Sequence, residues 1–416
     1  MTAESGQVEG WTDPEFEPVR DAFVRNFEKG DEVGAAFAAY HRGRKVVDLW
    51  GGIANTETGA PWEEDTIVLV YSTTKGITAM CANRLAQEGR LDVNSPVARY
   101  WPEFEQAGKG DVTVADLLAH RAGLAWVDGT MSTADALAWE PVIKALEAQK
   151  PSWEPGTAHG YHATTFGWLV GEVIRRVSGR SVGTYLRDEV TGPLGASFFI
   201  GLPDSEHHRP ARLISFLDAL ASGQAVAEAP AGPGLTEMAE LAKTYLAPGQ
   251  PLFLALGAPG GALSRQDIWN SPELWSAEIP AANGMCDARS LAALYASCIG
   301  DLELSGEGSF RLLEDDQLDR ALEQQTQGPD TVLLGLDLQW GLGFMLNRGM
   351  IADSGMGGFR SFGHFGMGGS VGWGDPDAGL GMGYVMNRMS MGMAGDKRSY
   401  RLMAATIEAA RRADGD

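Results

Sequence analysis

The sequence predicts an α+β fold, an α/β sandwich in which strands from both ends of the chain build one antiparallel sheet flanked by helices. Two strand-like segments occur within residues 33–50, and four more, flanked by glycines, occur within residues 340–387. The intervening residues 96–280 are instead rich in helix starts, prolines and loops. We therefore expect the sheet to be interrupted by an inserted all-helical region.

Length and composition agree with this organisation. The chain has 416 residues, of which 44% are hydrophobic and 21% charged, so it can bury a large core and form roughly two to three domain-sized units. We expect a discontinuous sheet domain, residues 12–95 plus 281–413, and an inserted, mainly helical domain, residues 96–280.

The N-terminal part is predicted to contain a helix and a hairpin. A capping residue and a proline at Asp13-Pro14 start the helix, and Phe16, Val19 and Phe23 fall on one apolar stripe. The predicted elements are a helix closing at Gly30, strands Val33–Tyr40 and Lys45–Trp50, a loop from Gly51 to Asp65, and an extended run, Thr66–Tyr71.

Caps and apolar spacing divide the rest of the chain. The predicted helices are Val114–His120, Thr133–Gln149, Thr164–Val177, Val182–Val190, Ala211–Ala221, Thr236–Leu246 and Ala288–Ile299. The predicted strands are Trp340–Leu346, Gly358–His364, Ser370–Trp373 and Gly381–Asn387, and an amphipathic helix, Lys397–Arg412, follows them.

A serine and a lysine three residues apart, Ser72 and Lys75, form a candidate nucleophile with its own base. Residues 77–89 have the apolar spacing of a helix, so Ser72 lies at its start, where free N–H groups and the helix dipole favour an anion. Lys75 lies one turn later on the same face and can activate the serine if its pKa is lowered. The alternative is a chance match, because the tetrapeptide alone is not specific.

Two further segments can contribute to such a site. Gly160-Tyr161-His162 lies between a Pro/Gly loop and a helix, so the Tyr161 phenol can reach a cleft and transfer protons; a packed aromatic is the alternative. Residues 363–370 form a glycine-dense strand edge whose main-chain N–H groups can stabilise an oxyanion. The alternative there is a bent strand packed on a helix.

Other motifs are weaker. A Gly-x-Ser-x-Gly match around Ser370 needs a helix after it, but residues 373–376 predict a turn, which disfavours Ser370 as nucleophile. His207 and His208 lie in an acidic segment where a solvated loop is favoured over a metal site, and His120 is expected to bond locally. We find no metal-ligand, phosphate-loop or dinucleotide motif, and no cofactor is implied.

Charge and cysteine content bear on location and partners. The formal net charge of −22 argues against nucleic-acid and anionic-membrane partners, because both require basic patches. Residues 1–10 lack the features of a signal peptide, and no transmembrane helix is visible. Cys81, Cys286 and Cys298 lie in predicted helices and are expected to be reduced core thiols. We therefore expect a cytoplasmic protein.

Taken in order, Ser72–Lys75, Tyr161 and His364–Gly366 resemble the motifs of the serine β-lactamase-like superfamily of penicillin-recognising enzymes. Within it the sequence is most similar to class C β-lactamases and family VIII carboxylesterases. Supporting segments are Leu117–Leu124, Trp153–Gly156, Gly192–Gly195, Pro280–Gly284 and Gly372–Asn387. The resemblance implies a β-lactamase/transpeptidase-like fold, with residues 204–275, where it is weakest, as a variable segment on the substrate side.

The resemblance also implies roles. Ser72 would be the acylated nucleophile, and Lys75 its base or the stabiliser of a tyrosinate. Tyr161 would protonate the leaving alkoxide and later activate the deacylating water. The N–H groups of Ser72 and Met367 would form the oxyanion hole. The residues expected to contact the substrate are His364, Phe365, Gly366, Trp126 and Trp153.

Two positions depart from the β-lactamase pattern. Ala163 stands where those enzymes have asparagine, and His364 where they have lysine. Both changes remove groups suited to a penicillin's amide and carboxylate, so we expect a serine carboxylesterase that cleaves small esters through an acyl-enzyme, with weak or absent β-lactamase activity. The alternatives are acyl transfer or amide or β-lactam hydrolysis by the same acyl-enzyme, and a non-catalytic binding protein.

Overall fold

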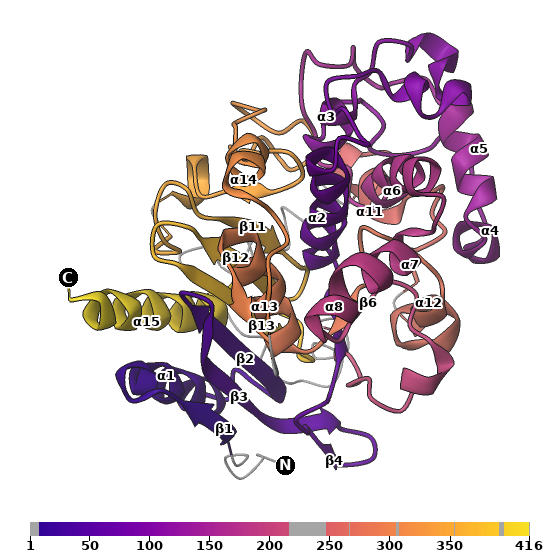
Figure 1. The fold of residues 1–416 in the computed structure, drawn as a ribbon. Coiled ribbons are helices and arrows are strands. Elements are labelled where there is room, and N and C mark those ends of the chain that lie inside the picture. The colour runs from indigo at the N-terminus through magenta and orange to yellow at the C-terminus, as the bar shows by residue number, and fades with distance from the viewer. Residues whose placement is uncertain are drawn as a thin grey trace.

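The structure is a computed structural model of the 416-residue chain. The residues that it describes are 8–215, 247–265, 267–304, 308–352, 354–390 and 395–415. A sheet with its covering helices lies beside a helical region (Figure 1). In these described ranges no helix is both long and apolar enough to cross a membrane.

The central sheet joins the two ends of the chain. In spatial order its strands are β1 (Val8–Thr12), β3 (Arg44–Asn55), β2 (Gly34–His41), β13 (Leu380–Met386), β12 (Val371–Asp375), β11 (Phe362–Phe365) and β10 (Met345–Leu346), with β4 (Ala60–Pro61) paired to β3. All pairs are antiparallel, and β2 meets β13 from His41 opposite Leu380 to Ala35 opposite Met386. The predicted α+β class is therefore confirmed.

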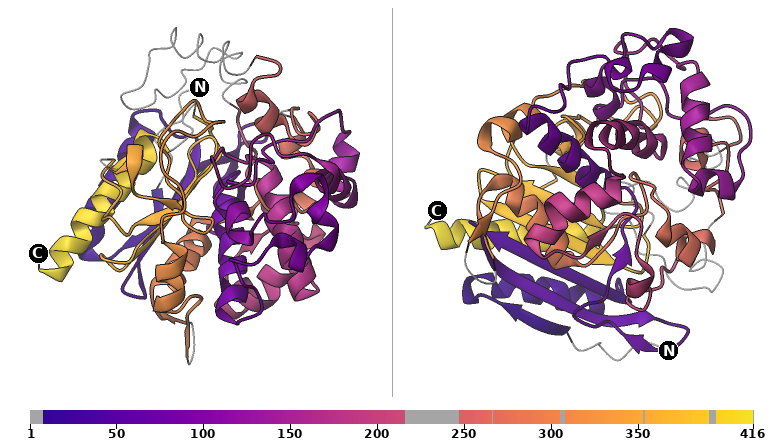
Figure 2. Two further views of the ribbon diagram at one scale, coloured as in Figure 1. Left: turned by 90° about the horizontal axis from the view of Figure 1, so that it is seen from above. Right: turned by 45° about the vertical axis from the view of Figure 1, so that its right-hand side comes forward.

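Helices cover both faces of this sheet (Figure 2). α1 (Glu17–Glu28) and α15 (Lys397–Asp414) pack together on one face, and α13 (Ala288–Ile299) lies along the other, against β2, β12 and β13. α13 can approach closely because β13 carries glycines on that side. A Cβ added to Gly381 would lie 2.4 Å from the Ala296 nitrogen, which a side chain could not tolerate.

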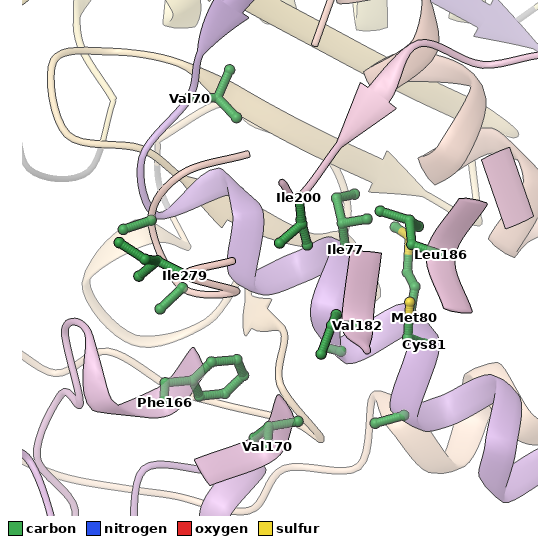
Figure 3. Packing of buried hydrophobic residues seen from close by; sticks show 14 of the residues in the cluster. Val70, Ile77, Met80, Cys81, Phe166, Val170, Val182, Leu186, Ile200 and Ile279 are labelled. Carbon is green, nitrogen blue, oxygen red and sulfur yellow. The ribbon is translucent and has the colours of Figure 1, made fainter. Parts of the chain in front are cut away.

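The helix α2 (Thr73–Gln87) lies between the sheet and the helical region. The other helices of that region are α3 (Val114–Leu118), α4 (Thr133–Leu137), α5 (Glu140–Ala148), α6 (Thr165–Ser178), α7 (Val182–Leu186) and α8 (Gly192–Leu194). Ile77 and Met80 of α2 pack among Val170 of α6, Val182 of α7 and Ile200 (Figure 3). This burial on several sides fixes the position of the α2 N-terminus.

Short elements complete the chain. A three-stranded sheet of β5 (Val68–Leu69), β7 (Met285–Cys286) and β6 (Phe198–Phe199) leads into α2. The remaining elements are α11 (Pro251–Gly257), α12 (Pro272–Ser276), α14 (Asp315–Ala321) and the pair β8 (Leu302–Glu303) and β9 (Ser309–Phe310).

Several predicted elements are confirmed. The helix predicted at Ala288–Ile299 has those bounds, and the Asp287 side chain caps it by accepting the Ser290 N–H at 2.7 Å. The N-terminal hairpin and the terminal helix are present as well. The boundaries proposed for the two domains stay a prediction.

Other predictions were wrong. The single helix predicted for residues 133–149 is two helices, α4 and α5. The chain turns at Trp139, which has a φ of 65°, and Pro141 lacks the N–H that a continuous helix would donate to the Leu137 carbonyl. Strand β3 continues through the predicted glycine loop to Asn55, and β1 was not predicted.

The segments that join the sheet to the helical region were also partly mispredicted. Cys286 lies in a strand rather than a helix, although all three cysteines are free and buried. Residues 211–215 are not helical, and the rest of the helix predicted at Ala211–Ala221 lies outside the described residues, as does the one at Thr236–Leu246.

Candidate active site

Ser72 is the N-cap residue of α2, as the sequence predicted. The preceding residue, Tyr71, has a φ of 44°, which is uncommon for a bulky side chain and turns the chain sharply from β5 into the helix. The Thr74 hydroxyl stabilises this turn by donating to the Tyr71 carbonyl at 2.5 Å and accepting the Gly284 N–H at 2.8 Å. Ser72 is therefore held at the positive end of a fully packed helix.

Lys75 brings its amine to the serine. Its Nζ lies 3.0 Å from Ser72 Oγ, and it donates to the main-chain carbonyls of Ala163 at 2.5 Å and Ala281 at 3.0 Å. A neutral amine has two N–H groups and one lone pair. Here Nζ donates to all three oxygens; when Lys75 is neutral, its two N–H groups can stay on the carbonyls and its lone pair can accept the serine proton.

Tyr161 completes the group. Its side chain is buried and forms a hydrogen bond with the Ser72 side chain, and Lys75 Nζ lies 4.8 Å from the centre of its ring. Trp340 supports the other side, with its ring stacked on Tyr161 at 5.7 Å and 17°. The structure thus brings together the three residues that lie 3 and 86 positions apart in the sequence.

Burial sets the charge states of this group. It lowers the pKa of Lys75 well below the usual 10.5, because removal from water disfavours the charged ammonium. It raises the pKa of the Tyr161 phenol, while the hydrogen bond with Ser72 acts in the opposite direction. The site therefore favours a neutral lysine, which can accept a proton, beside a protonated tyrosine, which can donate one.

The glycine-dense edge of β11 lies against the start of α2. Gly366 has no room for a side chain, since a Cβ there would lie 2.1 Å from the Val70 oxygen and 2.9 Å from Thr73 Oγ1. Ser370 links the same segments by donating its hydroxyl to the Val70 carbonyl at 2.9 Å, a buried structural role rather than that of a nucleophile. Met367, the predicted second oxyanion donor, directly follows Gly366.

His364 lies inside the site but is neutral. Its Nδ1 bonds the Phe365 carbonyl at 2.7 Å, so the proton lies on Nδ1 and the lone pair on Nε2. Burial, assisted by Lys75, lowers the pKa of His364 to about 3. His364 therefore cannot hold a substrate carboxylate by charge, as a lysine at this position would.

The other predicted contact residues differ in their placement. The Phe365 side chain points to the opposite face of the sheet, because successive strand residues alternate, and it packs on Trp373 and Tyr400. Its ring is thus unavailable to a substrate at Ser72. Trp153 is half-buried, donates to the Ala158 carbonyl at 3.2 Å and contacts His162, while Trp126 is half-buried nearby in the same apolar cluster.

Several residues that surround Tyr161 were not predicted from the sequence. His120 was expected to bond locally, but its Nδ1 accepts the N–H of His162, 42 residues away, at 3.1 Å. Asp330 accepts the Tyr161 N–H at 3.2 Å. Neither partner lies at a regular spacing from Tyr161, so no periodicity in the sequence could have indicated these contacts.

A cavity of about 340 Å³ is lined in part by Tyr71, the residue before Ser72, but not by Ser72, Lys75, Tyr161 or His364. One wall is Tyr71, whose ring packs on Trp269 at 4.8 Å, and another is Met389, which contacts Gly368. The remaining lining residues are Arg212, Leu213, Ser215, Asp267 and Asn270. The cavity is thus lined mainly by residues from the segment 204–275 and adjoins neighbours of both predicted oxyanion donors.

Metal ligands do not cluster in the described part of the chain, where no three His, Cys, Asp or Glu side chains meet at a metal-binding spacing. The His207 ring, which lies in the acidic segment, contacts the Leu202 carbonyl and the Ser276 hydroxyl instead.

Comparisons with known proteins agree on one family. The model of the family described as Beta-lactamase matches residues 20–406. The chain is 34% identical over 386 residues to a Mycobacterium tuberculosis protein named Esterase/beta-lactamase LipL, an alignment that covers 92% of this chain and 83% of that protein.

Solved structures give the same result. The crystal structure of a family VIII carboxylesterase shares 38% identity and a TM-score of 0.82, covering 97% of this chain and 100% of that one. A penicillin-binding protein homologue from Caulobacter crescentus shares 36% identity and a TM-score of 0.80, with the same coverage. The β-lactamase/transpeptidase-like fold is thereby confirmed.

Proposed function

This chain belongs to the beta-lactamase family, and from that premise we propose that it is a serine hydrolase that cleaves small carboxylic esters through an acyl-enzyme on Ser72. The main support for this proposal is the position of Lys75 Nζ, which lies 3.0 Å from Ser72 Oγ. Its other two hydrogen bonds are to the main-chain carbonyls of Ala163 and Ala281. A relative named as an esterase and a carboxylesterase structure support the ester chemistry.

Acylation follows from the charge states. Neutral Lys75 takes the proton of Ser72 as Oγ attacks the ester carbonyl, and the N–H groups of Ser72 and Met367 stabilise the oxyanion. As the tetrahedral intermediate collapses, the bond to the alkoxide breaks and Tyr161 donates its phenolic proton to the leaving oxygen. The Lys75 ammonium beside the ring then stabilises the tyrosinate and returns a proton to it.

Deacylation uses the same groups in reverse. Neutral Lys75 takes a proton from the incoming water, either directly or through Tyr161, which passes its own phenolic proton to Lys75 as it accepts one. The hydroxide then attacks the acyl carbonyl, the bond to Ser72 Oγ breaks, and the same proton returns to Ser72. The transfers among Ser72, Lys75 and Tyr161 occur between groups that already contact one another, and the proposed mechanism uses neither a metal nor an organic cofactor.

Two features favour esters over β-lactams in this proposal. The pKa of His364, lowered to about 3, leaves no positive charge at the position where a β-lactamase of this type would hold the substrate carboxylate. Ala163 contacts Lys75 through its main-chain carbonyl and offers no side-chain amide to a substrate. We therefore propose weak or absent β-lactamase activity.

The cavity beside Tyr71 provides room for one substituent of the ester. Its walls combine Tyr71, Trp269 and Met389 with polar side chains such as those of Arg212, Asp267 and Asn270, so the cavity offers both apolar contacts and hydrogen-bonding groups to a substituent. We propose that residues 204–275 lie on the substrate side and that a small ester is the partner.

The proposal is tested with p-nitrophenyl esters of graded acyl length and a fluorophosphonate probe. Wild-type protein should hydrolyse short esters, and the probe should label Ser72. The Ser72→Ala variant should neither hydrolyse the esters nor react with the probe. Ser370→Ala is the matched control, because Ser370 is a buried serine in the Gly-x-Ser-x-Gly match. In this variant the probe should still label Ser72. Hydrolysis retained by Ser72→Ala would refute the assignment, and absence of both reactions in wild type would favour a binding protein instead.

A chromogenic cephalosporin and added alcohol or amine acceptors extend the assay. Faster cephalosporin turnover than ester turnover would favour a β-lactamase, and acyl products formed with the acceptors would favour a transferase.

A further inference from the structure

Asp330 holds the main chain of Tyr161 from a distant loop. The Asp330 carboxylate is buried between α14 and β10, and its Oδ1 accepts the N–H groups of Tyr161 at 3.2 Å, Val332 at 2.8 Å and Leu333 at 2.6 Å. A single carboxylate oxygen thus closes its own loop and ties that loop to a residue 169 positions earlier.

A second contact lies directly beside the first. Thr331 donates both its N–H, at 3.0 Å, and its hydroxyl, at 2.9 Å, to the His159 carbonyl. Gly160 lies between these bonds, and a Cβ there would lie 2.3 Å from Thr331 Oγ1. Residues 330–331 are therefore packed against the main chain from His159 to Tyr161 and hydrogen-bonded to it. The tyrosine main chain cannot shift without breaking several of these hydrogen bonds.

We propose that Asp330 is a positioning residue for Tyr161, because its carboxylate accepts the tyrosine N–H and fixes the tyrosine main chain. The inference rests on the proposed function, in which Tyr161 must keep its proton until the alkoxide leaves. It assigns a role to a residue that does not itself touch the ester.

The second carboxylate oxygen points to an electrostatic role. Asp330 Oδ2 is buried and has no hydrogen-bond partner among the described residues, and the same holds for Nε2 of His159. Burial raises the pKa of Asp330, and its three N–H bonds and the charge of His159 oppose that rise. The Asp330 charge in turn adds to the raised pKa of Tyr161, so it helps to retain the phenolic proton.

Other titratable groups face Tyr161 from every neighbouring element. Lys75 approaches from α2, His120 lies 5.0 Å away after α3, and His364 on β11 is 6.1 Å away, measured between ring centres for the histidines. His162 follows on the same segment, with its pKa lowered to about 4 by burial. Burial lowers the pKa of all of these groups, whereas the interaction with Asp330 raises the pKa of Tyr161.

The asparagine variant separates charge from contact. Asp330→Asn keeps an oxygen that can accept the three N–H groups but removes the negative charge. The phenol of Tyr161 should then lose its proton more readily, so the alkaline limb of the kcat/KM profile should move to lower pH by about one unit. Asp337→Asn is the matched control, since Asp337 lies on the same loop and bonds no atom of Tyr161 among the contacts that the structure describes.

The measurement is the pH dependence of kcat/KM with a short p-nitrophenyl ester, together with a thermal melt of each variant. Ser72→Ala is assayed first. Residual hydrolysis by Ser72→Ala would contradict the proposed function itself, separately from the role of Asp330. A shifted alkaline limb in folded Asp330→Asn alone supports the proposal. A profile equal to that of Asp337→Asn overturns it, and so does unfolding of Asp330→Asn, which would assign Asp330 to loop stability.

Discussion

Replacing Lys75 by methionine tests the central claim of the mechanism. The substitution keeps an unbranched side chain of similar length in the buried position and removes the amine. Ser72 then loses the group 3.0 Å from its oxygen that accepts its proton, while the α2 N-terminus stays in place. The variant should still fold but should be unable to acylate at a useful rate.

The expected loss of activity is large. A positioned general base contributes about 10²–10⁴-fold, and nucleophile and base act as a unit. We therefore expect kcat/KM to fall by about 10³-fold or more, which corresponds to roughly 4 kcal/mol in transition-state stabilisation. The carbonyls of Ala163 and Ala281 also lose their donor, at a cost of about 1–3 kcal/mol each before the gain from burying methionine.

The chain offers a matched control for the stability cost. Lys109 is also buried, and its amine donates to the carbonyls of Gln106, Glu147 and Gln149 at 2.7–2.9 Å. Burial lowers its pKa to about 8, but no serine lies beside it. Lys109→Met should therefore destabilise the protein to a similar degree and leave ester hydrolysis within about twofold of wild type.

The assay combines initial rates on a short ester with urea unfolding. In wild type, activity should fall as the pH drops through the lowered pKa of Lys75, because protonation removes the base. The folded state binds fewer protons than the unfolded state between that pKa and 10.5, so the free energy of unfolding rises with pH in this window. Lys75→Met should lose this rise. Equal activity of the Lys75 and Lys109 variants would refute the role of Lys75.

Three further substitutions test other parts of the site. Tyr161→Phe removes the proton donor and should lower kcat by about 10²–10⁴-fold while fluorophosphonate labelling persists, which intact-protein mass spectrometry can follow; unchanged turnover would exclude Tyr161 as the acid. Gly366→Ala should reduce kcat/KM and thermal stability, because the added Cβ meets backbone at 2.1 Å, whereas Gly110→Ala, with open space around it, should leave both unchanged. Burial raises the pKa of Glu32 to about 7, so the folded state binds more protons than the unfolded state, and the free energy of unfolding should decline as pH rises from about 5 to about 8. Urea titrations of Glu32→Gln should show a smaller decline. A decline with pH equal to that of wild type would contradict the prediction.

The local parts of the site could be predicted from sequence. A serine and a lysine three residues apart lie on one face of any α-helix. The Ser72–Lys75 contact therefore requires only that residues 72–75 begin a helix. The cap at Asp287 is local in the same way, and its helix has the predicted bounds. The match in order of Tyr161 and His364 to a known family supplied the rest of the predicted set.

Contacts between distant segments could not be predicted in this way. The sequence does not show that the Ala163 carbonyl binds Lys75, or that Asp330 holds Tyr161, because each contact depends on how separate loops pack. The direction of the Phe365 ring could not be predicted for a related reason. Strand alternation places neighbours on opposite faces, but only the packed sheet shows which face meets α2.

By itself, the sequence determined the fold class, the Ser72–Lys75 pair at the start of a helix, and the family, because these depend on local spacing and on the order of motifs. Only the tertiary structure decided the charge states of the site. The pKa values of Lys75 and His364 are lowered because burial removes both side chains from water and disfavours their positive forms. Burial is a property of the packed chain, and the free energy of desolvation sets the protonation states on which the proposed mechanism depends.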